Sequence, residues 1–135
     1  MEPIICSKIN LTAETTSSLL PDEIRKELEK KGSVFLSVYT KRSNTLRFFP
    51  IKEENLHWLK VALKNFTPET SGKLLAELSK LVSEFVYSTG ICVTKSDCFW
   101  DGIILESAFK KKQEEIINTI KEIENVKKVT INMIE

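Results

Sequence analysis

Several features that mark common classes of protein are missing from this sequence. Its 135 residues contain no apolar run that approaches the ~20 residues of a membrane-spanning helix. The first residues, Met1 to Cys6, lack the basic start and the long apolar core of a secretory signal peptide. Three cysteines are an odd number and predict no disulfide framework, which fits a reducing compartment. We therefore expect a cytoplasmic protein with no membrane partner.

Motifs for catalysis are missing as well. The sequence contains no phosphate-binding loop, dinucleotide fingerprint, nucleophile elbow or metalloprotease motif. The one histidine, His57, has no obvious nucleophile or orienting acid as a partner in the sequence. These absences predict a protein that is not an enzyme and that carries no cofactor.

The composition is that of an ordinary globular protein, with 41% hydrophobic and 29% charged residues. Its richness in Lys, Ile and Glu is typical of a thermophilic, archaeal-like source. The charge is uneven: residues 1–52 carry a net charge of +3 and residues 53–135 a net charge of −2. The length and this difference favour two small domains, the first of which has a nucleic-acid role.

The first domain contains patterns for a strand, a helix and a hairpin. Pro21 followed by Asp22 and Glu23 predicts a helix start, because proline has its φ preset and acidic groups favour the positive end of the helix dipole. Alternating apolar residues on both sides of a polar break predict the hairpin. The expected elements are strands at 3–10 and 18–20, a helix at 21–32, and hairpin strands at 33–40 and 45–51.

The hairpin strands carry apolar residues on both faces. Val34, Leu36 and Val38 alternate with partly apolar neighbours such as Phe35 and Tyr39. A unit of about fifty residues has too little volume to bury so much apolar surface by itself. We therefore expect an obligate homodimer or a higher homo-oligomer.

The stretch Leu19-Leu20-Pro21-Asp22-Glu23-Ile24-Arg25-Lys26, together with the order of the predicted elements, resembles the swapped-hairpin module of the SpoVT/AbrB family. Related modules occur in MazE-type antitoxins. The resemblance covers roughly residues 4–51 and implies that two chains interleave their hairpins and bind double-stranded DNA. By position it implies DNA contacts from Lys8 on the first strand and from Arg25 and Lys26 on the helix.

The loop before the helix departs from the family pattern. Where the family often has glycine and a basic residue, this chain has Thr16 and Ser17, whose hydroxyl groups can hydrogen-bond phosphates. Glu14 adds a negative charge to the same loop, and each lost phosphate contact weakens DNA binding. The alternative hypothesis is a module that serves only for dimerisation.

Residues 53–135 contain the patterns of a second α+β domain. Thr67 before Pro68 is a favourable N-cap, and leucines at helical spacing follow it. The order strand, helix, strand, strand, helix, strand is the split βαβ arrangement of a ferredoxin-like fold. The expected strands are 57–64, 85–93, 98–105 and 129–134, and the expected helices are 69–84 and 107–125.

This second domain resembles the ACT domain and its relatives, which are ferredoxin-like sensors of small molecules. The resemblance implies a small-molecule effector such as an amino acid, although the typical Asp-Arg-Pro-Gly-like loop of these domains is absent. Free amides at a helix start favour an anionic group. The candidate ligand residues are Asn65 and Thr67 at the first loop and Ser88, Thr89 and Gly90 on the neighbouring strand.

Cys92 and Cys98 flank a predicted turn and can face each other across the hairpin. Because free cysteines are often buried small residues, we expect two buried thiols. With His57 or Asp97 they are also candidate metal ligands, since thiolates and imidazole suit zinc or copper. The sequence thus predicts an α+β transcriptional regulator; the alternatives are a sensor or assembly protein that does not bind DNA, and a thiol-based metal or redox sensor.

Overall fold

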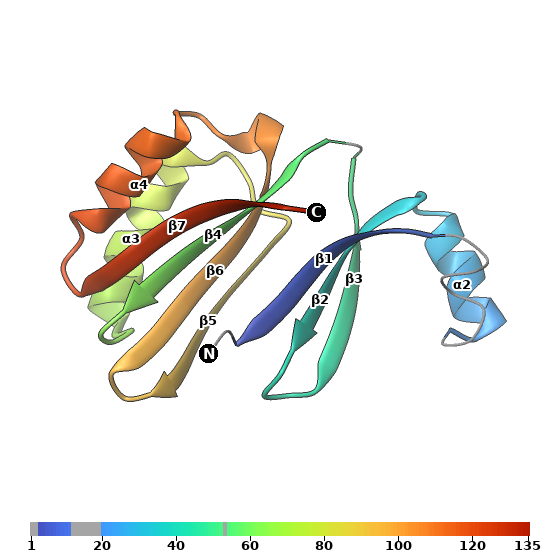
Figure 1. Cartoon of the computed structure of the whole chain (residues 1–135), viewed down its shortest axis with the longest axis horizontal. Coiled ribbons are helices and arrows are strands. Elements are labelled where there is room, and N and C mark those ends of the chain that lie inside the picture. Colours follow the sequence, from blue (N-terminus) through green and yellow to red (C-terminus); the bar gives the residue numbers. More distant parts are fainter. Residues whose placement is uncertain (1–2, 12–19, 53) are drawn as a thin grey trace. The chain divides into compact units, whose positions relative to one another are not determined.

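A computed structural model describes residues 3–11, 20–52 and 54–135 of the chain (Figure 1). The chain divides into two units, Met1–Glu53 together with Glu135, and Glu54–Ile134. The described residues form two antiparallel sheets, of three and four strands, and three α-helices, so the fold is α+β as predicted. Within these residues no helix has the length and apolar character needed to span a membrane.

The first unit is built on a sheet whose strands follow the order β1-β2-β3. Its elements are β1 (Ile4–Asn10), α2 (Asp22–Glu29), β2 (Val34–Thr40) and β3 (Thr45–Pro50). The turn between β2 and β3 contains Asn44 at a φ of 52°, a left-handed conformation in which asparagine is enriched. The predicted first strand and hairpin are therefore present.

Helix α2 is short and lies on the surface. Pro21 stands at its N-cap rather than inside its first turn, and Asp22 and Glu23 begin the helix. The helix buries no residue, and Gly32 follows it at a φ of +146°, a conformation that favours glycine. Most of the short strand predicted at 18–20 lies outside the described residues.

The second unit alternates strands and helices. Its elements are β4 (Leu56–Leu63), α3 (Pro68–Leu81), β5 (Tyr87–Thr94), β6 (Asp97–Leu105), a 3-10 turn at Glu106–Ala108, α4 (Gln113–Lys121) and β7 (Val126–Ile134). The strands follow the order β5-β6-β4-β7, and every neighbouring pair is antiparallel. Helices α3 and α4 lie on one side of this sheet (Figure 1).

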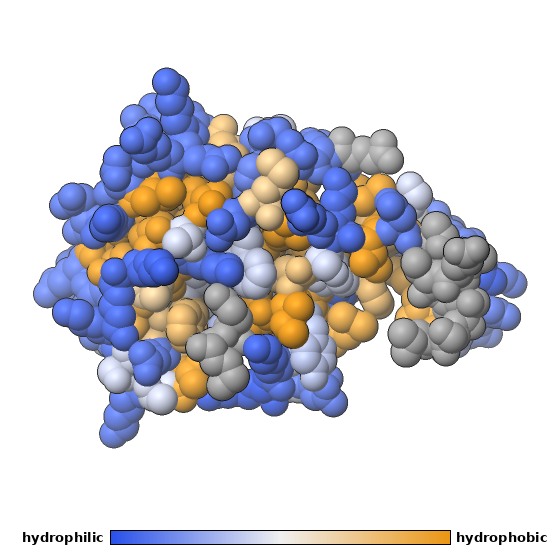
Figure 2. All heavy atoms as spheres, in the orientation of Figure 1, coloured by the Kyte–Doolittle hydropathy of each residue, from blue (hydrophilic) through white to orange (hydrophobic). Residues whose placement is uncertain are grey.

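The core of the second unit lies between the helices and the sheet. Leu74 and Leu78 of α3 and Ile116 and Ile120 of α4 are fully or almost fully buried. They belong to one cluster with side chains of β4, β6 and β7: Leu59, Val61, Leu63, Cys98, Trp100, Ile104 and Val129. Hydrophilic residues spread over the outer surface, with hydrophobic ones visible between them (Figure 2).

The long helix predicted at 107–125 is wrong at both ends, because α4 covers only Gln113–Lys121. The helix begins only at Gln113, and residues 109–112 before it are not helical. The backbone of this segment is paired elsewhere, because Lys110 N donates to Leu81 O at 2.9 Å and Ala108 O accepts from Ser83 N at 2.9 Å. Phe109 forms an antiparallel bridge with Val82. These bonds to the end of α3 replace the helical ones.

Candidate functional site

The loop between β4 and α3 meets strand β5 at Gly90, as the ligand hypothesis requires. The ring of Phe66 lies directly on the Gly90 backbone, so that a Cβ atom at this position would overlap the ring. Glycine is therefore required here by the close approach of Phe66. The side chain of Phe66 fills the space at Gly90 that the hypothesis assigned to a ligand.

A hydrogen-bonded network fixes the predicted residues Asn65 and Thr67. Its centre is Thr70, which is 4% exposed: its Oγ1 donates to Asn65 Oδ1 at 3.3 Å and accepts from Asn125 Nδ2 at 3.3 Å. Thr67 Oγ1 caps α3 by accepting from Thr70 N at 3.2 Å. Since this cap occupies one of the helix-start amides, fewer amides remain for an anion. Thr70 and Asn125 were not predicted, although a polar residue three positions after an N-cap is a recognisable signal.

The three predicted residues on β5 do not share one face. Ser88 and Gly90 lie opposite Gly102 and Trp100, whereas Thr89 lies opposite Asp101. Because successive side chains of a strand point to opposite faces, Thr89 faces away from Ser88 and Gly90. The five predicted ligand residues therefore do not form a single site.

The face of the sheet opposite the helices carries a polar arrangement that the sequence did not reveal. Trp58 Nε1 donates to Asp101 Oδ1 at 2.8 Å, and Asp101 is 1% exposed. The Nζ atom of Lys60 lies 4.2 Å from the centre of the Trp58 ring, and Lys60 is the register partner of Asp101. A hydrogen bond and a nearby cation offset the cost of burying a carboxylate. The period-two spacing of Trp58 and Lys60 was the available signal.

The candidate metal ligand His57 is not brought together with the two cysteines. His57 is 4% exposed at one end of β4, with Nε2 3.5 Å from Glu106 Oε1 and Nδ1 3.4 Å from Gln113 Nε2. Cys98 lies at the other end, opposite Leu63. No group of three or more His, Cys, Asp or Glu residues is placed to hold a metal ion in the described part of the chain.

Cys92 and Cys98 form a disulfide, so the expectation of two free buried thiols was wrong. They are register partners on the antiparallel strands β5 and β6, and directly opposed Cβ atoms in such a pair lie about 4.5–5.5 Å apart. This proximity is the physical reason for the bond. Cys98 is 1% exposed and Cys92 is half-buried, whereas Cys6 is of intermediate burial and forms no disulfide.

The predicted DNA-contacting residues lie on two elements of the first unit. Lys8 is half-buried on β1, and Lys26 is exposed on α2. Arg25 makes two ion pairs within its helix, with Glu29 at 2.9 Å and with Asp22 at 3.5 Å. A DNA phosphate has to compete with these carboxylates for Arg25. Thr16 and Ser17 lie outside the described residues.

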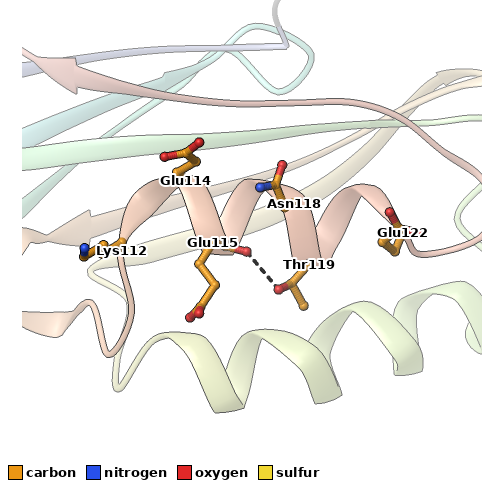
Figure 3. A pocket seen from close by; sticks show the side chains of 6 residues that line it. All are labelled: Lys112, Glu114, Glu115, Asn118, Thr119 and Glu122. Carbon is orange, nitrogen blue, oxygen red and sulfur yellow. Dashed lines mark hydrogen bonds between the residues drawn. The ribbon is translucent and has the colours of Figure 1, made fainter.

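Two surface grooves lie on the helical side of the second unit. One, of about 440 Å³, is lined by Lys112, Glu114, Glu115, Asn118, Thr119 and Glu122. Glu115 and Thr119 point toward α3, whereas Glu114 and Asn118 point away from it (Figure 3). The other, of about 700 Å³, is lined by Lys73, Ala76, Glu77, Thr119, Glu122, Ile123 and Glu124. Each groove has three glutamates and one lysine in its lining, a negative balance that disfavours an anionic ligand.

One carboxyl group at the β5–β6 turn has a shifted pKa. Lys127 Nζ lies 3.1 Å from Asp97 Oδ1, and Thr94 Oγ1 donates to Asp97 Oδ2 at 3.1 Å. These two hydrogen bonds, with the charge of Lys127, lower the pKa of the exposed Asp97 below its ordinary value. The turn is thereby tied to the first residues of β7.

No protein-family model matches this sequence, and no curated protein matches it either.

Proposed function

We propose that the chain is a homodimeric transcriptional regulator of the cytoplasm. Its first unit dimerises and binds double-stranded DNA, and its second unit responds to a small molecule. The observation that carries the proposal is the apolar row Ile5–Tyr39–Leu46, whose members are register partners across the first sheet. Ile5 and Leu46 are each 53% exposed.

This row supports a second copy of the chain as the partner of the first unit. No residue of α2 is buried, and Ile24 is 49% exposed, so the helix contributes no side chain to the core of the described residues. The other face of β2 carries the buried residues Leu36 and Val38. A sheet that is apolar on both faces in so small a unit gains stability when a second chain covers it. An interleaved pair of hairpins of the SpoVT/AbrB type supplies that cover.

The strand order β5-β6-β4-β7, with both helices on one side, supports a ferredoxin-like fold for the second unit. In this arrangement β4 and β5 run parallel to each other with β6 between them. We place the effector, a small molecule such as an amino acid, at the loop that contains Asn65 and Thr67. Phe66 has to swing away from Gly90 to admit it. Such a movement gives the two states that an effector can bias.

A second candidate function is an assembly or sensor protein that uses the first unit only for dimerisation. The ion pairs of Arg25 favour this candidate, because they neutralise one of the cations expected to meet phosphates. Helix α2 also contains more acidic than basic residues, namely Asp22, Glu23, Glu27 and Glu29 against Arg25 and Lys26.

Binding of the full chain to a labelled random duplex, measured by fluorescence anisotropy over a salt series, separates the two candidates. For the regulator we expect binding at low salt that weakens as salt rises, because counterions are released from neutralised phosphates. The Lys26→Ala change should reduce the slope of log affinity against log salt by about 1. The matched control is Lys121→Ala, in the last turn of α4.

Each outcome decides between the candidates. No detectable binding at low salt, or equal slopes for Lys26→Ala and the control, rejects the DNA function. A dimer that persists in the same preparation then favours the assembly protein. A wild-type chain that neither binds DNA nor forms a dimer rejects both candidates.

A further inference from the structure

The Cys92–Cys98 disulfide ties an outer strand of the four-stranded sheet to its neighbour. Strand β5 stands at one end of the order β5-β6-β4-β7, and the bond joins it to β6 beside the hairpin turn. The two sulfurs are not equivalent, because Cys92 is half-buried on the outer strand whereas Cys98 is 1% exposed within the core cluster. We therefore expect a thiol from solution to reach Cys92, the more exposed residue, before Cys98.

The bond is one of several interactions that hold this part of the fold together. It joins residues only six positions apart, and the stabilisation that a disulfide gives through chain entropy falls as the closed loop becomes shorter. The register of β5 against β6 continues from Cys92 back to Tyr87, and Lys127 separately anchors the turn through Ser96 O and Asp97. We therefore expect the chain to stay folded when the two sulfurs are reduced, with the end of β5 more mobile than in the oxidised chain.

In a reducing compartment, which the proposed function assumes, a disulfide of this kind is transient and serves sensing or catalysis. We infer that Cys92 and Cys98 form a thiol–disulfide exchange site whose substrate is a dithiol reductant and whose attacked sulfur is that of Cys92. The inference stands on the positions and burial of the two cysteines, and it does not depend on DNA binding.

The exchange proceeds in two balanced steps. A thiolate of the reductant attacks Cys92 Sγ, a mixed disulfide forms, and the bond to Cys98 breaks so that Cys98 leaves as a thiolate and takes up a proton. The second thiol of the reductant, as its thiolate, then attacks the first sulfur of the reductant, which is bonded to Cys92 in the mixed disulfide. The bond to Cys92 breaks, and Cys92 leaves as a thiolate that is protonated in turn. Two electrons pass to the protein, and the reductant becomes a disulfide.

The contact between Phe66 and Gly90 lies close to the Cys92–Cys98 pair and can respond to its redox state. Gly90, which supports the ring of Phe66, lies two residues before Cys92 on β5. With the pair reduced, the end of β5 loses its covalent link to β6 and keeps the strand pairing and the packing of Cys92 against the core. Reduction should therefore loosen the contact between β5 and the loop that contains Phe66.

The test uses the full chain with Cys6→Ser, which leaves only the two cysteines of the pair. The protein is purified without reductant, treated with dithiothreitol, alkylated with iodoacetamide and weighed by mass spectrometry. We expect no label before reduction, two labels after it, and circular dichroism that stays that of the folded chain. Two labels before reduction, or labels that appear only in denaturant, overturn the inference.

The direction of attack is tested with two further variants on the same background. Cys98→Ser leaves Cys92 alone and should form a mixed disulfide with oxidised glutathione at least about tenfold faster than Cys92→Ser, because exchange depends on access to the sulfur. Equal rates overturn the assignment of Cys92. If Cys98→Ser does not fold, hydrogen exchange of the Cys6→Ser chain decides: faster exchange of the β5 amides on reduction supports the site, and unchanged exchange rejects it.

Discussion

The two units of this chain differ in how much of the apolar surface of their sheets is covered. In the second unit, α3 and α4 cover one side of a four-stranded sheet and bury Leu74 and Ile120 completely. In the first unit, no residue of α2 is buried, and the three-stranded sheet leaves Ile5 and Leu46 half exposed. The same sheet buries Leu36 and Val38 completely, so the apolar surface that it leaves exposed is that of Ile5 and Leu46. We propose that a second copy of the chain covers this exposed apolar surface.

The largest expected effect tests whether the second unit has a closed core. Ile120→Ala removes a fully buried side chain and should lower the free energy of unfolding by about 2–5 kcal/mol, since lost transfer energy and a cavity add together. Leu75→Ala is the control, because Leu75 lies on α3 but is 49% exposed, and should change stability by no more than about 0.5 kcal/mol. Urea unfolding followed by tryptophan fluorescence measures both, since Trp58 and Trp100 lie in this unit. Similar losses for the two variants would contradict a closed core.

The next largest effect on stability is expected from substitution of Gly90, with Gly72 as the comparison. Gly90→Ala should cost about 1–3 kcal/mol, because the added methyl group overlaps the Phe66 ring. Gly72→Ala meets nothing within 4 Å on α3 and should stabilise the chain by about 0.5–1 kcal/mol. Thermal unfolding of both variants checks the signs, and Phe66→Ala should remove most of the cost of Gly90→Ala. If Gly90→Ala did not lower the stability, the close contact between Phe66 and Gly90 would be contradicted.

The smallest effect concerns the ion pair at the β5–β6 turn. Lys127→Ala should raise the pKa of Asp97 toward its ordinary value, because the hydrogen bond and charge of Lys127 are lost. Since the folded pKa is lowered, the small contribution of this pair to stability is present above the ordinary Asp pKa of about 3.9 and is lost as the pH falls through the folded pKa. An NMR titration of the carboxyl group measures the shift. Lys128→Ala, its exposed neighbour, should leave the pKa in place, and an equal shift in both variants would argue against the pair.

Much of the fold was accessible from the sequence because strands alternate and helices carry caps. The hairpin at β2 and β3 and the N-cap Thr67 follow directly from such local signals. Residues 107–112 did not follow, because the competing bonds come from the end of α3, which is remote in sequence. Local periodicity cannot report a backbone group that is satisfied by a distant partner.

The candidate site was less accessible, since it depends on which side chains meet. The sequence predicted that the β4–α3 loop lies beside Gly90, but it did not predict that the ring of Phe66, from this loop, packs on the Gly90 backbone. Strand alternation alone would have separated Thr89 from Ser88, had the register of β5 been known. The opposition of Cys92 and Cys98 was anticipated, whereas their bond was not.

The oligomeric state of the full chain tests the central claim, that the first unit is completed by a second copy. Sedimentation equilibrium should give a mass twice the 15.5 kDa of one chain, and Leu46→Lys should reduce it to that of the monomer. The control Leu75→Lys, on the exposed side of α3, should remain dimeric. A wild-type chain that stays at 15.5 kDa at every concentration, or a Leu46→Lys chain as dimeric as the wild type, would contradict the claim.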